Sequence, residues 1–170
     1  HLTLTVTDVI SGRTGKLQRD VAIDDYAENG LKVSDVMLVQ SLRDTVRDLR
    51  FRRGSYEVVP NPMRIFQAPQ TLAFYCEVYH LKKNDFGQTH YKITTGVKAV
   101  DKERPMPSGP MQQPEVALSY EQVGTQDWER LPLEIDLNNA QPGTNRLVVV
   151  VEDLHTGERV ARETFFEYIK

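Results

Sequence analysis

The chain has 170 residues, 39% of them hydrophobic and 26% charged, which is ordinary for a water-soluble globular protein and leaves room for one domain plus a fragment. Its net charge of −3 argues against a general nucleic-acid binder, which would usually be basic. No apolar run approaches the roughly 20 residues that a membrane-spanning helix needs, and residue 1 opens directly into a strand-like pattern, so any export signal is expected to lie outside this sequence.

The first 23 residues predict a β-hairpin. Leu2, Leu4 and Val6 alternate with threonines, which is the pattern of a strand with one apolar face and one hydroxyl face. The segment SGRTGK turns the chain, and a second strand follows through Val21 and Ile23. Residues 24–30 are polar and are interpreted as a connector.

Extended structure resumes in LKVSDVMLVQSL, residues 31–42. Residues 43–54, RDTVRDLRFRRG, fit either a short helix or a charged loop, and the loop is favoured. SYEVVPNPMRIF predicts a strand that ends at Pro60 and Pro62.

The second half of the chain predicts strand after strand. TLAFYCEVYHL and HYKITTGVKAV are expected to be neighbouring strands joined by the turn KKNDFGQ, and the four prolines of residues 103–114 predict an exposed, mobile loop. EVALSYEQVG, WERLPLEIDL, RLVVVVEDL and RVARETFFEY follow as strands. RLVVVVEDL is apolar on both faces and is therefore expected to be central in its sheet.

Seven strands at short spacing from Ser55 onward predict an all-β fold: an immunoglobulin-like or fibronectin-like antiparallel β-sandwich over residues 31–170, with the N-terminal β-hairpin before it. The cysteine pair of antibody domains is absent, because Cys76 is the only cysteine and is expected to be a buried apolar side chain. The period-two pattern predicts these core residues: Phe74, Cys76, Val78, Ile93, Val97, Leu133, Ile135, Val149 and Val151.

The chain begins as it ends. When Leu2 is aligned with Leu147, Val6 falls on Val151, Asp8 on Asp153 and Gly12 on Gly157. An aspartate followed four residues later by glycine suits a turn that needs a positive φ. Residues 1–30 are therefore interpreted as the terminal hairpin of a preceding similar domain plus the connector, with chance similarity as the alternative. The apolar face of this hairpin must find cover, either on the sandwich that follows or on another copy through an open strand edge, which makes a homo-oligomer possible.

Two surfaces are candidates for partner contact. Tyr75, Glu77 and Tyr79 lie on the face of their strand opposite to Cys76, where they are either exposed for contact or covered by residues 31–42. The arginines of the charged segment are diluted by aspartates, so they form either a self-paired surface or a site for an acidic partner; they include Arg43, Arg47 and Arg50.

No motif for catalysis, phosphate binding or metal binding occurs, and no cofactor is expected. His80 and His90 flank one predicted turn, with Asp85 as the only nearby third ligand, but exposed turn histidines are favoured. Asp136, Asn138 and Asn139 offer oxygen ligands for calcium, but an ordinary turn is the favoured interpretation.

Three segments resemble one family. LKVSDVMLV, VVPNPMRIF and FYCEVYHL, together with the closing PGTNRLVVVVEDLHTGERV, resemble the C-terminal, immunoglobulin-like region of bacterial GWxTD-domain proteins. The Gly-Trp-x-Thr-Asp motif itself is absent, and the one tryptophan, Trp128, stands in QDWERL. The resemblance implies a periplasmic or extracellular protein and no catalytic residues. The expected function is a non-catalytic structural or protein-interaction module of an exported bacterial multidomain protein. The alternative is a carbohydrate- or ligand-binding accessory domain, which the 8% aromatic content disfavours.

Overall fold

Alternation of apolar and polar residues continues along the chain, and it produces strands in almost every segment. The computed structural model describes residues 1–27, 29–100 and 116–170. In these residues there are thirteen strands and one short 3-10 helix: β1 (Leu2–Thr7), β2 (Thr14–Arg19), β3 (Lys32–Val33), β4 (Met37–Arg43), η1 (Leu49–Phe51), β5 (Arg52–Arg53), β6 (Tyr56–Pro60), β7 (Ile65–Gln67), β8 (Leu72–Tyr79), β9 (Thr89–Ala99), β10 (Val116–Gly124), β11 (Trp128–Ile135), β12 (Gly143–Asp153) and β13 (Arg159–Ile169).

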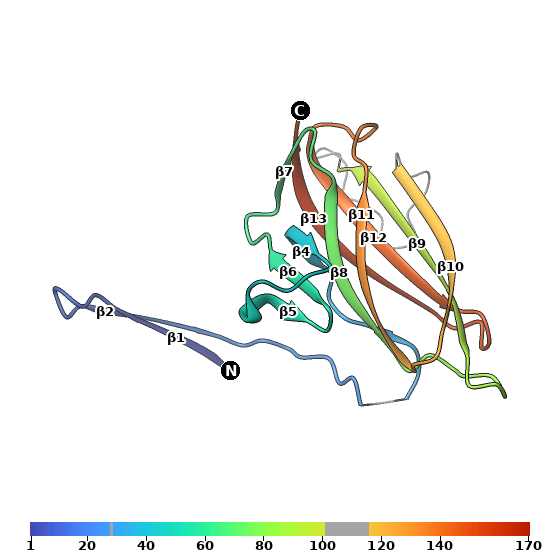
Figure 1. Cartoon of the computed structure of the whole chain (residues 1–170). Coiled ribbons are helices and arrows are strands. Elements are labelled where there is room, and N and C mark those ends of the chain that lie inside the picture. Colours follow the sequence, from blue (N-terminus) through green and yellow to red (C-terminus); the bar gives the residue numbers. More distant parts are fainter. Residues whose placement is uncertain (28, 101–115) are drawn as a thin grey trace.

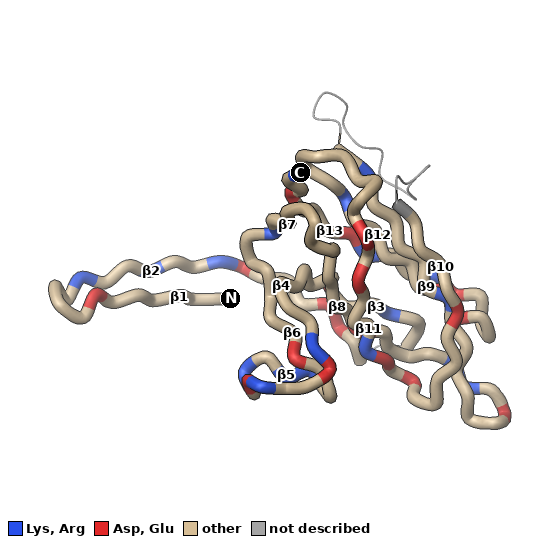
Figure 2. The backbone as a smooth tube through the Cα atoms, turned by 45° about the horizontal axis from the view of Figure 1, so that its top comes forward, with Lys and Arg blue, Asp and Glu red and all other residues tan. Residues whose placement is uncertain are grey.

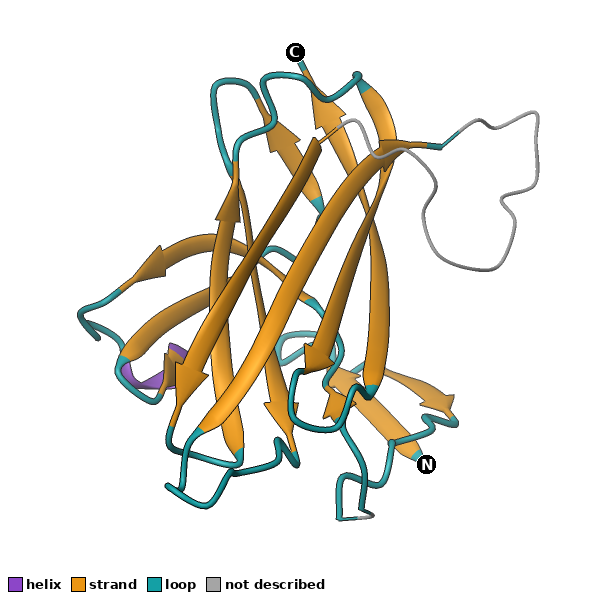
Figure 3. Cartoon of the chain, turned by 90° about the vertical axis from the view of Figure 1, so that its right-hand side faces the viewer, coloured by secondary structure: helices purple, strands orange, loops and turns teal. Residues whose placement is uncertain are grey.

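The strands form a β-sandwich from which a separate hairpin projects (Figure 1). One sheet has the order β10-β9-β12-β13-β7, in which β7 runs parallel to β13. The other sheet has the order β11-β8-β4-β6-β5, and β3 also pairs with β8. Figure 3 shows the long strands of the two layers crossing one another. The predicted all-β sandwich is therefore confirmed, and so is the central position of RLVVVVEDL, because β12 pairs with β9 on one side and β13 on the other.

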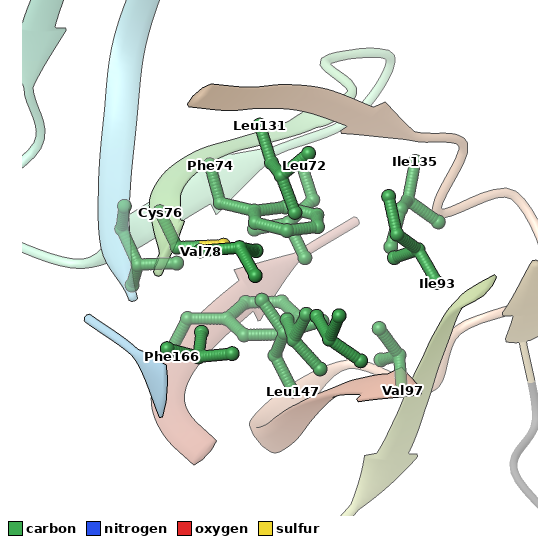
Figure 4. Close-up of a cluster of buried hydrophobic side chains, with 14 of the residues drawn as sticks. Leu72, Phe74, Cys76, Val78, Ile93, Val97, Leu131, Ile135, Leu147 and Phe166 are labelled. Atoms are coloured by element: carbon green, nitrogen blue, oxygen red, sulfur yellow. The ribbon is translucent and has the colours of Figure 1, made fainter. Parts of the chain in front are cut away.

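The core lies between the two sheets (Figure 4). Leu72, Phe74, Cys76 and Val78 of β8 face the apolar residues of β9, β12 and β13, and the Phe66 and Phe166 rings meet edge to face with centroids 5.7 Å apart. All the predicted core residues are buried except Leu133, which is half-buried and packs against the cluster. Its neighbours on the same face of β11, Leu131 and Ile135, are buried, so the exposure is confined to this one position.

A second apolar cluster covers the opposite face of the β8 sheet. Its buried members are Val39, Val58, Ala73 and Tyr75, with Met37, Leu42 and Tyr56 packed against them. Ala73 and Tyr75 alternate along β8 with the residues of the main core, so β8 is buried on both faces. The run LAFYCEV is accordingly apolar throughout.

Three details differ from the sequence-based predictions. The strand count is larger than the predicted seven, because residues 31–60 contribute strands to the β8 sheet. β8 and β9 belong to different sheets and do not pair, so KKNDFGQ crosses the sandwich instead of closing a hairpin. The charged segment is a loop over residues 44–48, as favoured, but Arg43 ends β4, and the 3-10 turn η1 and the short strand β5 follow the loop. The Arg50 amide of η1 donates to the Asp48 side chain.

One further prediction is not tested by the structure, and one further observation concerns membrane-spanning helices. The predicted mobile loop at residues 103–114 lies outside the described residues. Among the residues that are described, there is no helix with the length and apolar character to cross a membrane.

The buried thiol of Cys76 gives a direct test of the core. The Cys76 side chain is inaccessible, and burial raises the pKa of its thiol to about 12, with a further contribution from the Glu77 charge. The reactive form is the thiolate, so we expect no reaction with a disulfide reagent at pH 8 in the native state and one equivalent after unfolding in guanidinium chloride. Rapid reaction of the native protein would contradict the placement of β8.

Candidate functional site

Glu77 lies at the centre of a polar cluster on the outer face of β8. Tyr75 and Tyr79 stand two residues before and after it, so all three side chains leave the strand on the same face. The Tyr75 hydroxyl donates to Glu77 Oε1 and the Tyr79 hydroxyl donates to Glu77 Oε2. Burial, and then the hydrogen bond to Glu77, raises the pKa of both tyrosines, which therefore stay protonated donors at neutral pH. The carboxylate is held in one orientation by two fixed donors.

β11 brings an arginine and the tryptophan to this cluster. In the antiparallel register Arg130 lies opposite Glu77, and Trp128 lies opposite Tyr79. Arg130 Nε is 3.7 Å from Glu77 Oε1, and the guanidinium carbon lies 4.3 Å from the centroid of the Trp128 ring. Arg130 therefore stacks on the indole face while facing the carboxylate, an arrangement that combines a cation–π contact with an ion pair.

The turn between β5 and β6 packs against the Arg130 guanidinium, which Trp128 and Glu77 already contact. A Cβ placed on Gly54 would lie 2.7 Å from Arg130 Nη1, and Gly54 has a φ of +62°, which favours glycine. Within the part of the chain that the structure describes, the buried Nε atom of Arg130 has no hydrogen-bond partner. Confined by Trp128, Gly54 and Glu77, this side chain is a preorganised donor with hydrogen-bonding capacity left over.

Two hollows flank Glu77. One, of about 420 Å³, is lined by Glu77, Tyr79, His80, Asp127, Trp128 and Arg130. The other, of about 470 Å³, lies between the outer face of β8 and the connector, which contributes residues 21–24 and Tyr26. The Tyr26 and Tyr79 rings are 5.0 Å apart, and His80 Nε2 is 2.6 Å from the Tyr26 carbonyl oxygen. The connector therefore lies against the edge of the cluster.

The predicted contact tyrosines differ in accessibility. Tyr75 is buried, because the second apolar cluster covers its ring, so it contributes a hydroxyl group but no contact area. Tyr79 and Glu77 are half-buried. For Tyr75 the structure agrees with cover by residues 31–42, because Met37 and Val39 pack in the same cluster as its ring. β3 and β4 pair beside β8, and the Ser34 hydroxyl accepts the Glu77 amide at 2.9 Å.

Two arginines of the charged segment, Arg43 and Arg50, pair with acidic groups close by. Figure 2 shows stretches of basic and acidic residues next to one another along the backbone around β5 and β6. Arg43 Nη1 is 2.6 Å from Glu57 Oε1, and Glu57 Oε2 accepts the amides of Asp48 and Arg47 at 2.6 and 2.7 Å. These backbone hydrogen bonds lower the pKa of Glu57, with a smaller contribution from Arg43. Arg50 forms a two-pronged pair with Asp48. The geometry agrees with the self-paired alternative, and these residues are separate from the Glu77 cluster.

A broader hollow of about 710 Å³ lies on the outer face of the other sheet. Small and apolar residues form its floor, including Thr94, Gly96, Val148 and Val150. Its charged rim contains the pairs Arg146–Glu163 and Arg159–Glu152. Among the described residues, none that lines it has a buried side-chain donor without a hydrogen-bond partner.

The suggested metal ligands are not brought together. Among the described residues no group of three or more histidine, cysteine, aspartate and glutamate side chains could hold a metal ion. The His90 ring lies 6.2 Å from that of His155, and its Nε2 is 3.0 Å from Glu121 Oε2, whereas His80 contacts the connector. Asp136 accepts the amide of Asn138 at 2.8 Å, which is an ordinary turn.

Trp128 and Arg130 are the functional candidates that sequence reasoning missed. They are 49 or more positions from Tyr79 along the chain, and only the pairing of β11 with β8 places them beside it. The alternation of WERLPLEIDL indicates that Trp128 and Arg130 share a face, but not which strand lies next to that face. No family model, curated protein or solved structure matches the chain.

Proposed function

We propose that this chain is a non-catalytic protein-interaction module of an exported bacterial multidomain protein, and that the surface formed by Tyr79, Trp128 and Arg130 binds a peptide segment of a protein partner. The observation that carries the proposal is the Arg130 guanidinium, which is confined by Trp128, Gly54 and Glu77, belongs to a side chain that is still 35% exposed, and lines a hollow. The resemblance of residues 58–66 and 74–81 to GWxTD-domain proteins supports the periplasmic or extracellular setting.

The composition of this surface favours a protein ligand. Tryptophan, tyrosine and arginine contribute more binding energy at protein interfaces than other residues do, and they do so best when they are already fixed. Arg130 is fixed by Trp128, Gly54 and Glu77 before any partner arrives. A backbone carbonyl of the partner can satisfy its donors, and an apolar partner side chain can pack beside the half-exposed indole.

A carbohydrate ligand fits this surface less well. Sugars bind to aromatic side chains by stacking on an open ring face, and one face of Trp128 is occupied by the Arg130 guanidinium. Asp127 and Glu77 leave the hollow with more negative than positive charge, which also disfavours an acidic partner.

Trp128 is the only tryptophan, so its fluorescence reports on this surface alone. Peptides selected from a displayed random library against the whole chain are expected to change that fluorescence on titration, with micromolar dissociation constants. Arg130→Ala should weaken binding about tenfold or more, since it removes a desolvated arginine from the centre of the contact. The matched control is Arg159→Ala, which removes an exposed arginine paired with Glu152 on the other sheet and should leave the affinity unchanged.

Melting curves of both variants establish that the fold is retained. Peptides that bind equally well to Arg130→Ala and leave the fluorescence unchanged would contradict the proposal and direct attention to the hollow over Gly96 and Val148. Titration with cellohexaose and chitohexaose tests the carbohydrate alternative: a fluorescence change with these sugars and none with peptides would overturn the assignment of a protein ligand.

A further inference from the structure

The two hairpins of the chain are the same structure. Residues 145 positions apart have the same partners: Leu2 pairs with Arg19 as Leu147 pairs with Thr164, and Val6 pairs with Gly15 as Val151 pairs with Val160. The identical register means that the same positions share a face in both hairpins.

The two turns also match bond for bond. The Asp8 amide donates to Arg13 O at 2.9 Å and the Gly12 amide to Asp8 O at 2.8 Å; the Asp153 amide donates to Glu158 O at 2.9 Å and the Gly157 amide to Asp153 O at 2.7 Å. In each turn one carboxylate oxygen accepts the amides two and three residues further on. Gly12 and Gly157 have φ values of +68° and +75°. The hydrogen bonds and φ values of the two turns therefore match more closely than four identical residues alone would indicate.

The hairpins differ in what covers them. Leu147, Val149 and Val151 are fully buried, whereas the equivalent Leu2, Leu4 and Val6 are 59%, 54% and 62% exposed. Leu17, opposite Leu4, lies on the same bare face, and Val21 and Ile23 continue the alternation of apolar residues beyond the end of β2, where they line the hollow beside Tyr75 and Glu77. The opposite face carries threonines, two of which, Thr7 and Thr14, are 3.2 Å apart at their hydroxyls. Figure 1 shows β1 and β2 projecting away from the sandwich.

The turn aspartates show the same contrast. Asp153 is buried, and its second carboxylate oxygen accepts the amide of Lys82, in the loop between β8 and β9, at 2.7 Å. This bond ties the β12–β13 turn to the rest of the sandwich. The equivalent oxygen of the exposed Asp8 accepts only the hydroxyl of Ser11, at 2.8 Å. Asp8 therefore has the turn geometry of Asp153, but no described loop of the sandwich donates to its second carboxylate oxygen.

We propose that β1 and β2 form a docking element that completes the sheet of a second β-sandwich of the same architecture. β1 pairs with the partner's equivalent of β9, as β12 does here through Leu147 and Val97, and the face of Leu2, Leu4 and Val6 covers the partner's equivalent of β8. Asp8 accepts an amide of the partner's β8–β9 loop. A two-stranded hairpin is marginally stable alone, so docking supplies the missing burial.

The partner that receives the hairpin is a sandwich that lacks its own closing hairpin. A second copy of this chain has that place filled by β12 and β13, so its core is not the receptor. Val21 and Ile23 stand where Phe166 and Tyr168 fill the core, and Arg19 stands at the buried Thr164 position. The partner therefore supplies larger side chains opposite Val21 and Ile23. This inference does not depend on the peptide surface at Trp128.

A fusion tests the docking mode in the full chain. Residues 31–145 are repeated in front of residue 1, so that residues 1–23 follow them where residues 146–168 follow in the native order. We expect the amides of residues 2–19 to exchange about 100-fold more slowly in the fusion than in the full chain alone, because they become part of a packed sheet. Leu4→Asp in the same fusion should abolish this protection, and Asp8→Ala should reduce it.

A second fusion tests whether a mismatch of side-chain volume, and not the docking mode itself, prevents protection of the hairpin amides. It carries Arg19→Thr, Val21→Phe and Ile23→Tyr, which restore the inward residues of β13. Protection in either fusion supports the docking mode. Absence of protection in both overturns it, and so does light scattering that shows the unfused full chain to be a dimer with a protected hairpin, since a second copy would then be the cover. Neither result bears on peptide binding at Trp128.

Discussion

Val149→Asp is expected to lower the free energy of unfolding by about 4 kcal/mol or more, enough to leave much of the protein unfolded at 37 °C. Val149 is fully buried in β12, where it pairs with Thr95 of β9 and with Arg162 of β13. A carboxylate at this position would face the apolar side chains of β8, and the guanidinium of the opposite Arg162 is already bonded to the Val33 carbonyl and to Asp24. Because β12 is the central strand of its sheet, the chain has no local way to bring the charge to water.

Chemical denaturation followed by circular dichroism measures this loss. The matched control is Val123→Asp, the same substitution at an exposed position of the edge strand β10, where the cost should stay within about 1 kcal/mol. If both variants kept nearly the stability of the wild type, β12 would not be packed as described. A similar large loss in both would show that the aspartate disrupts strands in general and does not report on burial.

The sequence was sufficient to predict the fold class, because burial on one face leaves a period-two pattern that is visible without knowing the partner strand. Val149 and Val151 could be assigned to the core and β12 to a central strand on this ground, since RLVVVVEDL is apolar on both faces. The hairpin of residues 1–23 was predicted for the same reason, although its second strand ends at Arg19 instead of reaching Ile23.

Strand pairing was the part that the pattern could not supply. A turn such as KKNDFGQ fits equally well between paired strands and between strands of opposite sheets, and here β8 and β9 lie in different sheets. The alternative in which His80 approaches His90 depended on that pairing. Burial of Tyr75 among side chains of β4 agrees with the alternative that residues 31–42 cover it, but the contribution of β6, whose place in the sheet is set by long-range contacts, could not be assigned.

The candidate site depended on the same missing information. Tyr79 and Glu77 could be selected from the sequence because they share a strand and a face, whereas Arg130 and Trp128 joined them only through the register of β11 on β8. The run of charge in residues 43–54 made three arginines candidates for partner contact: Arg43, Arg47 and Arg50. Their pairing with Glu57 and Asp48 could not be assigned from spacing, because Glu57 lies on a different strand.

Asp153→Ala is expected to destabilise the sandwich by about 2 to 4 kcal/mol, whereas Asp8→Ala should leave the stability of the sandwich within about 0.5 kcal/mol of the wild type. Asp153 is buried, and its carboxylate accepts the amides of Lys82 and His155 at 2.7 and 2.8 Å. Removing it leaves those donors unsatisfied and cuts the link between the β12–β13 turn and the β8–β9 loop. Asp8 occupies the same position in a matching turn, but it is exposed and reaches no other element.

The two variants control for each other, because each removes the same side chain from the same local turn. Thermal unfolding should show a fall of about 5 to 15 °C for Asp153→Ala and little change for Asp8→Ala, at the usual few degrees per kcal/mol for a chain of this size. Asp153→Asn should fall between them, since its amide oxygen can still accept one of the donors. If both alanine variants melted alike, the turn itself would account for the effect and the tie to Lys82 would contribute nothing. A loss of stability confined to Asp153→Ala would show that this turn stabilises the sandwich only where its aspartate also bonds to a second loop. Asp8 bonds only within its own turn among the described residues.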